Sequence, residues 1–426
     1  MKFLFKEWRE SWIPELVERE FDIEKIMPKK INKIITFTGA RRVGKTYLMF
    51  QSIKQLSQRM DKDRIFYINF EDERIERKKE TLTNLIPQLL EMYGEKDYYL
   101  FLDEIQVMPS WEKWLRRVYD KYKNFRFFVS GSTSKLSLKE IPKALRGRTL
   151  NKKVFPLSFK EFLKFKNIEL EKDFYYSEKK LNKIKNQLRE YLEYGGFPEV
   201  VLEDEEQNKK RLIQEYFRTI VALDLGEKYN IKNLELLSDL LKLMLNSTMF
   251  SHNKMYNILK SMGKKVGKES MVNYVKKSQE IFFSYLLPIF SYKIKDQMQY
   301  PKKLYFNDNG FINYVGLKFS EDLGRLLENV VAIELKRRGK EIYYWSDRKK
   351  REVDFVIKEG TEIKQLIQVC YNLNEETKDR EIKSILKASK DLSCKDLTII
   401  TWDQEKRKKI EGKTIQMVPI WKWILS

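Results

Sequence analysis

Histidine and cysteine are scarce in this sequence. Its 426 residues include one histidine, His252, and two cysteines, Cys370 and Cys394. Two cysteines exclude a disulfide framework and a cysteine-rich zinc module. A single histidine argues against a Ser-His-Asp triad and against a histidine-rich metal site. Any catalytic chemistry must therefore depend mainly on carboxylates and backbone amides.

Long apolar runs are also missing. The longest, residues 281–290, is interrupted by Ser284 and Pro288, and it is far shorter than the ~20 residues that span a bilayer. The first twelve residues, MKFLFKEWRESW, carry charges from the start and lack the apolar stretch of a secretory signal. We therefore expect a cytoplasmic protein with no membrane partner.

Positive charge is in clear excess. The chain has 84 Lys and Arg against 62 Asp and Glu, which gives a formal net charge of +22. Hydrophobic residues make up 42% of the chain, so it can bury cores, and its length predicts roughly two to four domains. A charge of this size indicates an anionic partner without saying which one.

The clearest motif follows a β-branched and aromatic run at residues 34–38, which is typical of a buried strand. This run leads into Gly39-Ala40-Arg41-Arg42-Val43-Gly44-Lys45-Thr46, a full match to GxxxxGK[ST], and a helical segment starting with Tyr47 follows. The two glycines let backbone N–H groups surround a phosphate at a helix N-terminus. Lys45 is expected to reach the β- and γ-phosphates, and the Thr46 hydroxyl to bind Mg²⁺. Residues 39–47 are thus the predicted nucleotide site.

A second strand carries the carboxylates that such a site needs. Residues 98–102 are continuously apolar, and Asp103 and Glu104 follow them directly. We expect Asp103 to hold Mg²⁺, directly or through water, and Glu104 to polarise the attacking water. A glutamate in this position favours hydrolysis over phosphoryl transfer to a small acceptor.

Two more strands, at residues 64–70 and 125–129, complete a predicted parallel α/β sheet. Ligands bind beyond the carboxyl ends of parallel strands. Ser130 and Ser132, which follow the last of these strands, are therefore predicted to act as polar sensors near the γ-phosphate. The alternative is that they form an ordinary turn.

Two arginines, Arg146 and Arg148, flank Gly147. A guanidinium that one subunit supplies to the γ-phosphate of a neighbour stabilises the charge of the transition state. We expect at least one of the two to act in this way, which predicts a homo-oligomer. The alternative is a pair of solvated arginines in a basic chain.

Together these motifs resemble archaeal and bacterial AAA+-type P-loop ATPases that carry a winged-helix segment and a C-terminal restriction-endonuclease-like domain. The resemblance implies ATP as the nucleotide and a helical lid after the sheet. No Asn-Lys-x-Asp guanine signature follows a strand in the ATPase segment. The matching motifs are GARRVGKT at 39–46, LDEIQ at 102–106 with Trp111 after it, SGS at 130–132, RGR at 146–148, FPLSFKEF at 155–162 and GGFPE at 195–199.

The middle of the chain is basic and patterned as a winged helix. Two helices are predicted at 251–261 and 269–279, joined by a glycine-flanked turn, and a β-hairpin wing is predicted within 281–306. Between 251 and 303 there are eleven Lys and three acids, a net charge of +8. This charge predicts contact with the backbone of duplex DNA. The alternative is a packing or protein-interaction module.

The order of elements in the C-terminal part resembles the restriction-endonuclease-like fold, in which a helix Glu, a strand Asp and a Glu-x-Lys form one metal site. Glu328 and Asp354 match the first two positions. Gln368 and Cys370 stand where the resemblance requires Glu and Lys, so we expect a vestigial site without nuclease activity. Lys364 is the alternative source of a lysine.

The predicted architecture is α/β, with a parallel-sheet ATPase domain over 1–165, a helical lid over 166–246, a winged helix over 247–315 and the restriction-endonuclease-like domain over 316–426. We expect an ATP-hydrolysing enzyme that uses ATP and Mg²⁺ and couples its nucleotide state to DNA binding. One alternative is a nucleotide-dependent switch or scaffold that acts on a protein partner without DNA. An active Mg²⁺-dependent nuclease is the less favoured alternative.

Overall fold

The computed structural model describes residues 1–11, 13–131, 145, 147–171, 173–316 and 322–426. The chain divides into two compact units, residues 1–155 and 156–426. The sequence predicted a boundary at residue 165, but the first unit ends at residue 155. The reason is that helix α7 (Phe159–Phe165) packs on helices of the second unit. The predicted lid, winged helix and C-terminal domain all belong to that second unit.

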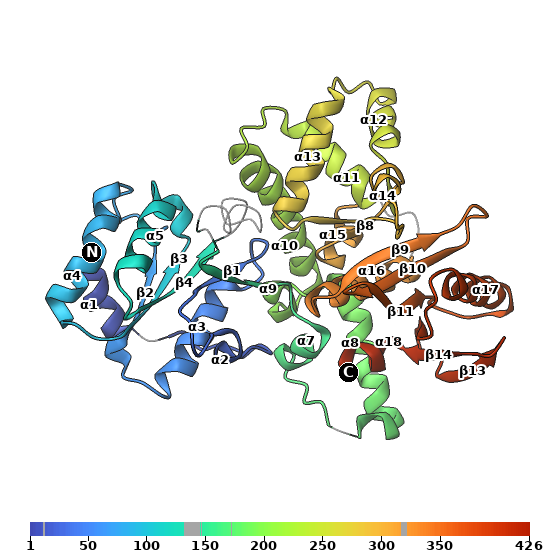
Figure 1. Cartoon of the computed structure of the whole chain (residues 1–426), viewed down its shortest axis with the longest axis horizontal. Helices are drawn as coiled ribbons and strands as arrows, with labels where there is room; N and C mark the ends of the chain where they lie inside the picture. The colour runs from blue at the N-terminus through green and yellow to red at the C-terminus, as the bar shows by residue number, and fades with distance from the viewer. Residues whose placement is uncertain (12, 132–144, 146, 172, 317–321) are drawn as a thin grey trace. The chain divides into compact units, whose positions relative to one another are not determined.

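The first unit is built on a parallel five-stranded sheet (Figure 1). Its strand order is β2-β3-β4-β1-β5, so β4 lies between β1 and β3. Every residue of β1 is buried, as expected for a strand covered on both faces. The strands are β1 Ile34–Thr38, β2 Ile65–Asn69, β3 Tyr98–Asp103, β4 Phe125–Gly131 and β5 Thr149–Lys153.

Helices cover both faces of this sheet. One face packs against α1 (Lys2–Glu10), α4 (Lys79–Tyr93) and α5 (Trp111–Lys121), which share a single apolar cluster with alternate strand residues. Helix α3 (Lys45–Ser57) contacts β4 and contributes nothing to that cluster, since it covers the other face. A short helix, α2 (Ile23–Ile26), packs on α3.

The second unit begins with helices, as the sequence predicted. They are α7, α8 (Glu178–Tyr194), α9 (Pro198–Leu202), α10 (Glu206–Thr219), a π-helical continuation at Ile220–Glu227, and α11 (Leu234–Leu245). The break between α8 and α9 needs both of its glycines. A Cβ on Gly195, which has a φ of +82°, would lie 1.7 Å from the Asp308 carboxylate, and one on Gly196 would lie 2.6 Å from the Leu157 carbonyl oxygen.

Helices α12 (His252–Ser261) and α13 (Lys268–Glu280) form as predicted. The strands of the predicted hairpin are β7 (Ser284–Leu287) and β8 (Lys302–Phe306), and β6 (Met249–Phe250) pairs with the other edge of β8. The two strands of the predicted hairpin are connected through a short helix, α14 (Ile294–Gln299). Helix α15 (Asn309–Tyr314) follows β8.

The C-terminal part is a mixed sheet with helices. Helix α16 (Leu323–Arg337) precedes a six-stranded sheet of order β13-β14-β12-β11-β10-β9, in which β11, β12 and β14 are parallel. In the described part of the chain, no helix has the length and apolar character that crossing a bilayer requires. The remaining elements are β9 Glu341–Ser346, β10 Glu352–Glu359, β11 Glu362–Val369, α17 Glu375–Asp391, β12 Leu397–Thr401, β13 Lys406–Ile410, β14 Lys413–Pro419 and α18 Ile420–Leu425.

Candidate functional site

The loop between β1 and α3 is shaped at two positions that require glycine. Gly44 caps α3 with a φ of 86°, a left-handed conformation that glycine adopts at no steric cost. Gly39 passes so close to β5 that an added Cβ would lie 2.2 Å from the Val154 carbonyl oxygen. The loop therefore delivers its backbone to the N-terminus of a 13-residue helix, where unpaired N–H groups favour an anion.

Lys45 is buried inside this loop. Its ammonium donates hydrogen bonds to the carbonyl oxygens of Ala40 at 2.9 Å and Gly39 at 3.4 Å. The neighbouring turn includes Arg42, which has a positive φ of 66°. In the first turn of α3, Tyr47 is 54% exposed, so its ring lies at the surface of the unit.

One residue that sequence reasoning missed ties the loop to the rest of the unit. The Arg19 guanidinium donates hydrogen bonds to the carbonyl oxygens of Val43 at 2.9 Å and Phe155 at 3.1 Å. The backbone N–H of Arg19 also donates to the side-chain oxygen of Gln51 on α3. No linear motif marks Arg19, because its partners lie far along the sequence.

Asp103 is the point where polar side chains of the site converge. Its Oδ2 accepts hydrogen bonds from the Thr46 hydroxyl at 2.7 Å and the Tyr67 hydroxyl at 2.8 Å. Its Oδ1 accepts from the Ser130 hydroxyl and from the backbone N–H of Glu104. The two predicted metal ligands are thus in direct contact, and Ser130 reaches them because β4 lies between β1 and β3. Tyr67, on β2, is a participant that the sequence did not indicate.

The electrostatics of Asp103 suit a cation. Burial, and then the charge of Glu104, raise the pKa of Asp103 to about 6, while Thr46, Tyr67 and Lys45 act in the opposite direction. A carboxylate that is this costly to ionise gains strongly from a divalent ion beside it. The hydroxyl and carboxylate oxygens here are ligands that Mg²⁺ prefers, so the residues present fit Mg²⁺ bound with a nucleotide phosphate.

Glu104 is held in place by a neighbour on its own loop. It has a φ of 50°, and its carboxylate accepts a hydrogen bond from the side-chain amide of Gln106. Burial, and then the charge of Glu104, also raise the pKa of Glu71, which follows β2. Neither Glu71 nor Gln106 was predicted as a site residue, although Gln106 ends the LDEIQ motif and Glu71 stands in the acidic run after β2.

Of the two arginines predicted to act on a γ-phosphate, Arg148 lies in the described part of the chain. Arg148 makes a bidentate ion pair with Asp120, with both N–O distances 2.9 Å. It precedes β5 and therefore lies at the amino edge of the sheet, away from the nucleotide loop of its own chain. Action on a neighbouring subunit stays a prediction. Arg146 and Ser132 lie outside the described residues.

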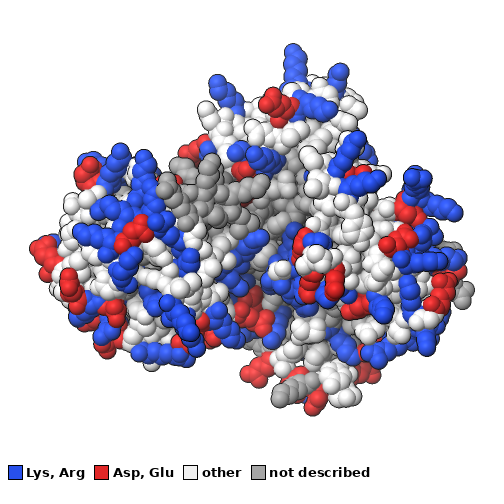
Figure 2. Space-filling view, in the orientation of Figure 1, with Lys and Arg blue, Asp and Glu red and all other residues white. Residues whose placement is uncertain are grey.

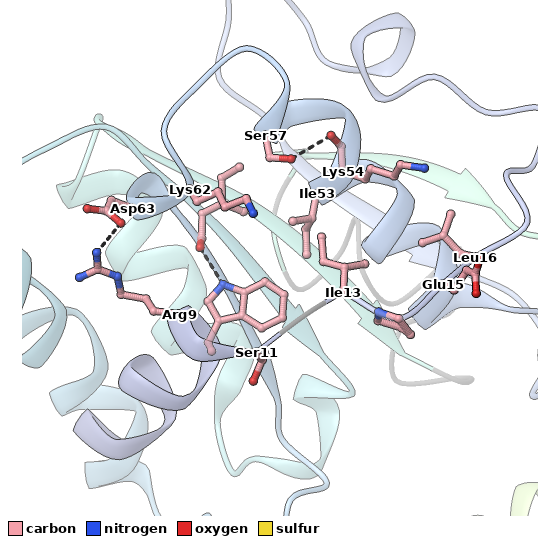
Figure 3. Close-up of a pocket in the computed structure, with 13 residues that line it drawn as sticks. Arg9, Ser11, Ile13, Glu15, Leu16, Ile53, Lys54, Ser57, Lys62 and Asp63 are labelled. Atoms are coloured by element: carbon pink, nitrogen blue, oxygen red, sulfur yellow. Dashed lines mark hydrogen bonds and ion pairs between the residues drawn. The ribbon is translucent and has the colours of Figure 1, made fainter.

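A cavity of about 540 Å³ lies at the other end of α3 and is distinct from the nucleotide loop (Figure 3). Its polar lining groups are largely engaged with one another. Arg9 pairs with Asp63 at 2.6 Å (Figure 3). The Trp8 indole N–H donates to the Ile65 carbonyl oxygen at 2.8 Å. This cavity adds no group that reaches a phosphate in the loop.

The second unit contains a buried cluster of charges that the sequence predicted only in part. The ammonium of Lys303, on β8, lies 2.9 Å from Glu328 on α16, 2.7 Å from Glu352 and 2.6 Å from Asp354 on β10. Lys303 is 5% exposed. Glu328 and Asp354 therefore do meet, as expected, but the lysine beside them comes from the segment that was predicted to face DNA.

Two of the three other residues considered for this cluster, Gln368 and Lys364, make their side-chain ion pairs and amide hydrogen bonds with other carboxylates. Gln368 receives a hydrogen bond from the Asp354 backbone N–H at 3.2 Å, and its amide donates to Glu381 at 2.6 Å. Lys364 is exposed and pairs with Glu362 at 2.5 Å, so the alternative that it supplies the site lysine is wrong. Burial, and then Glu328, raise the pKa of Asp354 to about 7.

The basic face of α12 and α13 is smaller than the sequence predicted. Lys264 pairs with Glu235 at 2.6 Å and Asp239 at 2.7 Å, and Lys277 lies 4.0 Å from the ring centre of Tyr229. Among the charged side chains that Figure 2 shows over the part of the unit that holds these helices, Lys and Arg outnumber Asp and Glu. The exposed lysines of the two helices and their turn are Lys254, Lys260, Lys265, Lys268 and Lys276.

Comparison with known protein families divides the chain into three consecutive segments. Residues 31–163 match the family model described as an AAA domain, and residues 185–322 and 323–423 match two domains of unknown function, DUF8612 and DUF4143. An uncharacterized protein of Methanocaldococcus jannaschii, MJ1544, is 41% identical over 97% of this chain and 92% of its own length. An uncharacterized Haemophilus influenzae protein is 28% identical over 98% of both chains. The solved Walker-type ATPase PABY2304 of Pyrococcus abyssi is 15% identical, with a TM-score of 0.46 over 69% of this chain and 93% of that one.

Proposed function

Since the chain belongs to the same family as the uncharacterized M. jannaschii protein, with an N-terminal AAA domain followed by two domains of unknown function, we propose that it binds and hydrolyses Mg²⁺-ATP. The observation that carries this proposal is the 2.7 Å contact between the hydroxyl of Thr46 and the carboxylate of Asp103, beside the glycine loop. A hydroxyl and a buried carboxylate held together at a helix N-terminus suit a metal-bound triphosphate.

Each group has a defined task in this proposal. The N–H groups at the start of α3 and the ammonium of Lys45 bind the phosphates, and Thr46 and Asp103 would hold Mg²⁺, which when bound would neutralise charge that develops on the phosphates. Glu104 orients the attacking water and accepts its proton. The Ser130 hydroxyl keeps the Asp103 carboxylate in one orientation through its hydrogen bond. The Gln106 amide does the same for Glu104, so both carboxylates stay oriented while the phosphates bind.

We further propose that the nucleotide state is coupled to duplex DNA through α12 and α13. The five exposed lysines on these helices and their turn support contact with phosphates, which is electrostatic and independent of sequence. The helix pair and the antiparallel strands that follow it are the elements of a winged helix.

The test is the ATPase rate with and without duplex DNA over a salt series. We expect DNA to stimulate hydrolysis and the stimulation to fall steeply as salt rises. A variant with Lys265, Lys268 and Lys276 changed to Glu should lose the stimulation by DNA. The matched control is a variant in which three exposed lysines of the C-terminal sheet region, Lys390, Lys395 and Lys406, are changed to Glu. This control should keep most of the stimulation by DNA. Equal stimulation in both variants would contradict the proposed DNA surface.

A second candidate function is a nucleotide-dependent switch for a protein partner. It is favoured by apolar side chains at and beside α14, where Tyr292 is 79%, Ile294 73% and Met298 75% exposed. Exposed apolar groups gathered in one segment are typical of protein contact surfaces. This candidate predicts tight nucleotide binding, slow turnover and no response to DNA even at low salt.

A further inference from the structure

Lys303 and the acids around it depend on one another. A buried ammonium is stable only when it is paired, and Lys303 is 5% exposed. Its Nζ lies within 2.9 Å of oxygens from three different carboxylates, Glu328, Glu352 and Asp354. Carboxylates this close raise one another's energy unless a cation lies between them. The cluster therefore needs a cation, and it already contains one.

We propose that the ammonium of Lys303 is the resident cation of this cluster and occupies the position that a divalent metal ion would otherwise take. A lysine ammonium has three N–H donors, and here three carboxylate oxygens lie 2.6–2.9 Å from it. Glu328 and Asp354 accept hydrogen bonds from the ammonium, and Glu352 forms an ion pair with it. Among the residues that the structure describes, no group of three or more His, Cys, Asp or Glu is arranged to hold a metal.

The spacing of the oxygens suits nitrogen better than Mg²⁺. Magnesium requires oxygens at about 2.0–2.1 Å, and calcium accepts about 2.3–2.6 Å. The carboxylate oxygens around Nζ are 2.6 Å or more away from it, so they would have to close in on Mg²⁺ but hardly at all on Ca²⁺. Removal of the ammonium should therefore create a site for the larger ion first.

The surrounding groups complete the cluster without a metal. The Tyr305 hydroxyl donates to Glu328 at 2.6 Å, and the Val369 backbone N–H donates to Asp354 at 2.7 Å. Gln368, on the neighbouring strand, directs its amide to Glu381 instead. The oxygens that a metal would use are therefore already occupied by donors of the chain.

This cluster gives the second unit a fixed internal clamp. Lys303 belongs to β8, and its partners belong to α16 and β10, so the ion pairs hold β8 against the C-terminal sheet at any Mg²⁺ concentration. A hydrolytic centre needs a metal that is free to bind water and substrate. The clamp is independent of the proposed ATPase and DNA functions.

The test compares Ca²⁺ and Mn²⁺ binding by the nucleotide-free protein and by Lys303→Ala. Calorimetric titration, together with terbium luminescence excited through the nearby Tyr305, reports the cluster. We expect the wild type to show no binding at the cluster above background, and Lys303→Ala to bind Ca²⁺ with an affinity at least about tenfold above that background. The double variant Lys303→Ala/Asp354→Asn should lose that gain, and Lys302→Ala, one residue away, should behave as the wild type.

Two results would overturn the proposal. One is a wild-type protein that binds Ca²⁺ or Mn²⁺ and loses this binding in Asp354→Asn. The other is a folded Lys303→Ala that gains no affinity. If Lys303→Ala does not fold, the wild type and Asp354→Asn decide the question, because a resident ammonium predicts that their titrations are the same.

Discussion

At the scale of single residues, Asp103 determines how the nucleotide site is organised. Hydroxyl groups from β2, β4 and α3 all donate to its carboxylate. Burial also raises the pKa of Tyr67, so the phenol remains a protonated donor. A carboxylate restrained from three elements loses little freedom when a metal binds, which favours tight and well-oriented binding.

Nucleotide binding and hydrolysis should be separable by two substitutions. Lys45→Ala removes the ammonium that is proposed to bind the phosphates and should abolish ATP binding in a fluorescent-nucleotide titration. Glu104→Gln keeps the shape of the site but removes the base, so it should bind ATP and turn over about 10²–10⁴-fold more slowly. Lys54→Ala is the matched control, since Lys54 is an exposed lysine of the same helix that pairs with Glu18. Wild-type turnover in Glu104→Gln would rule out its role as base.

Some residues of this site can be predicted from local sequence motifs, and others cannot. Lys45 and Thr46 follow from a local motif, and Asp103 from an apolar strand that ends in acids. Tyr67 and Arg19 carry no such local signal, because what brings them to the site is the sheet order and the path of the N-terminal segment. Local patterns thus predict the reacting groups better than the groups that orient them.

At the scale of elements, one buried carboxylate joins the end of α8 to the start of α15. Asp308 accepts hydrogen bonds from the backbone N–H of Gly196 at 2.7 Å and of Gly310 at 2.9 Å. Burial raises the pKa of Asp308 to about 7, although these two bonds and Arg337 act in the opposite direction. The paired glycines after α8 are therefore explained by packing and need no role in catalysis.

The stability of this junction should depend on pH. An aspartate in the unfolded chain has a pKa of about 3.9, so between about pH 4 and about pH 7 the folded protein holds a proton on Asp308 that the unfolded chain lacks. Its contribution to the free energy of unfolding should therefore fall as pH rises through that window. Asp308→Asn does not titrate, so in denaturant titrations the wild type should lose stability relative to it, by up to about 1.4 kcal/mol per pH unit. Parallel profiles would contradict the raised pKa.

Some elements were not predictable from pattern. β13 has the sequence KRKKI, and its row of charges resembles a solvated loop. It forms a strand because it is an edge strand joined to β14 by a two-residue turn, in which Glu411 and Gly412 both have positive φ. Strands buried on both faces, such as β1 and β3, were predicted because their apolar character shows directly in the sequence.

At the scale of the whole molecule, the chain consists of two units with separate cores. The nucleotide loop, Asp103 and Glu104 belong to residues 1–155, whereas α12, α13 and the Lys303 cluster belong to residues 156–426. Each unit is long enough to bury a core of its own. Nucleotide binding should therefore stabilise the first unit directly.

Calorimetry should reveal this division. We expect two unfolding transitions, and Mg²⁺-ATP should raise the midpoint temperature of only one of them. At a hundredfold excess over the dissociation constant, the free energy of unfolding of that unit should increase by about 2.7 kcal/mol. Lys45→Ala should abolish the shift and leave the other transition in place. A single transition that moves as a whole would instead mean that the two units unfold cooperatively.

The position of Lys303 limits where this chain can be cut into fragments and which segments can be exchanged between relatives. The lysine lies within the segment 185–322, whereas all three of its acidic partners lie within 323–423, the neighbouring family-level segment. A fragment cut between these segments would retain either a buried cation without acids or a group of acids without a cation. Exchange of one segment between relatives should therefore yield a folded chimera only when both halves of the charge cluster come from compatible parents.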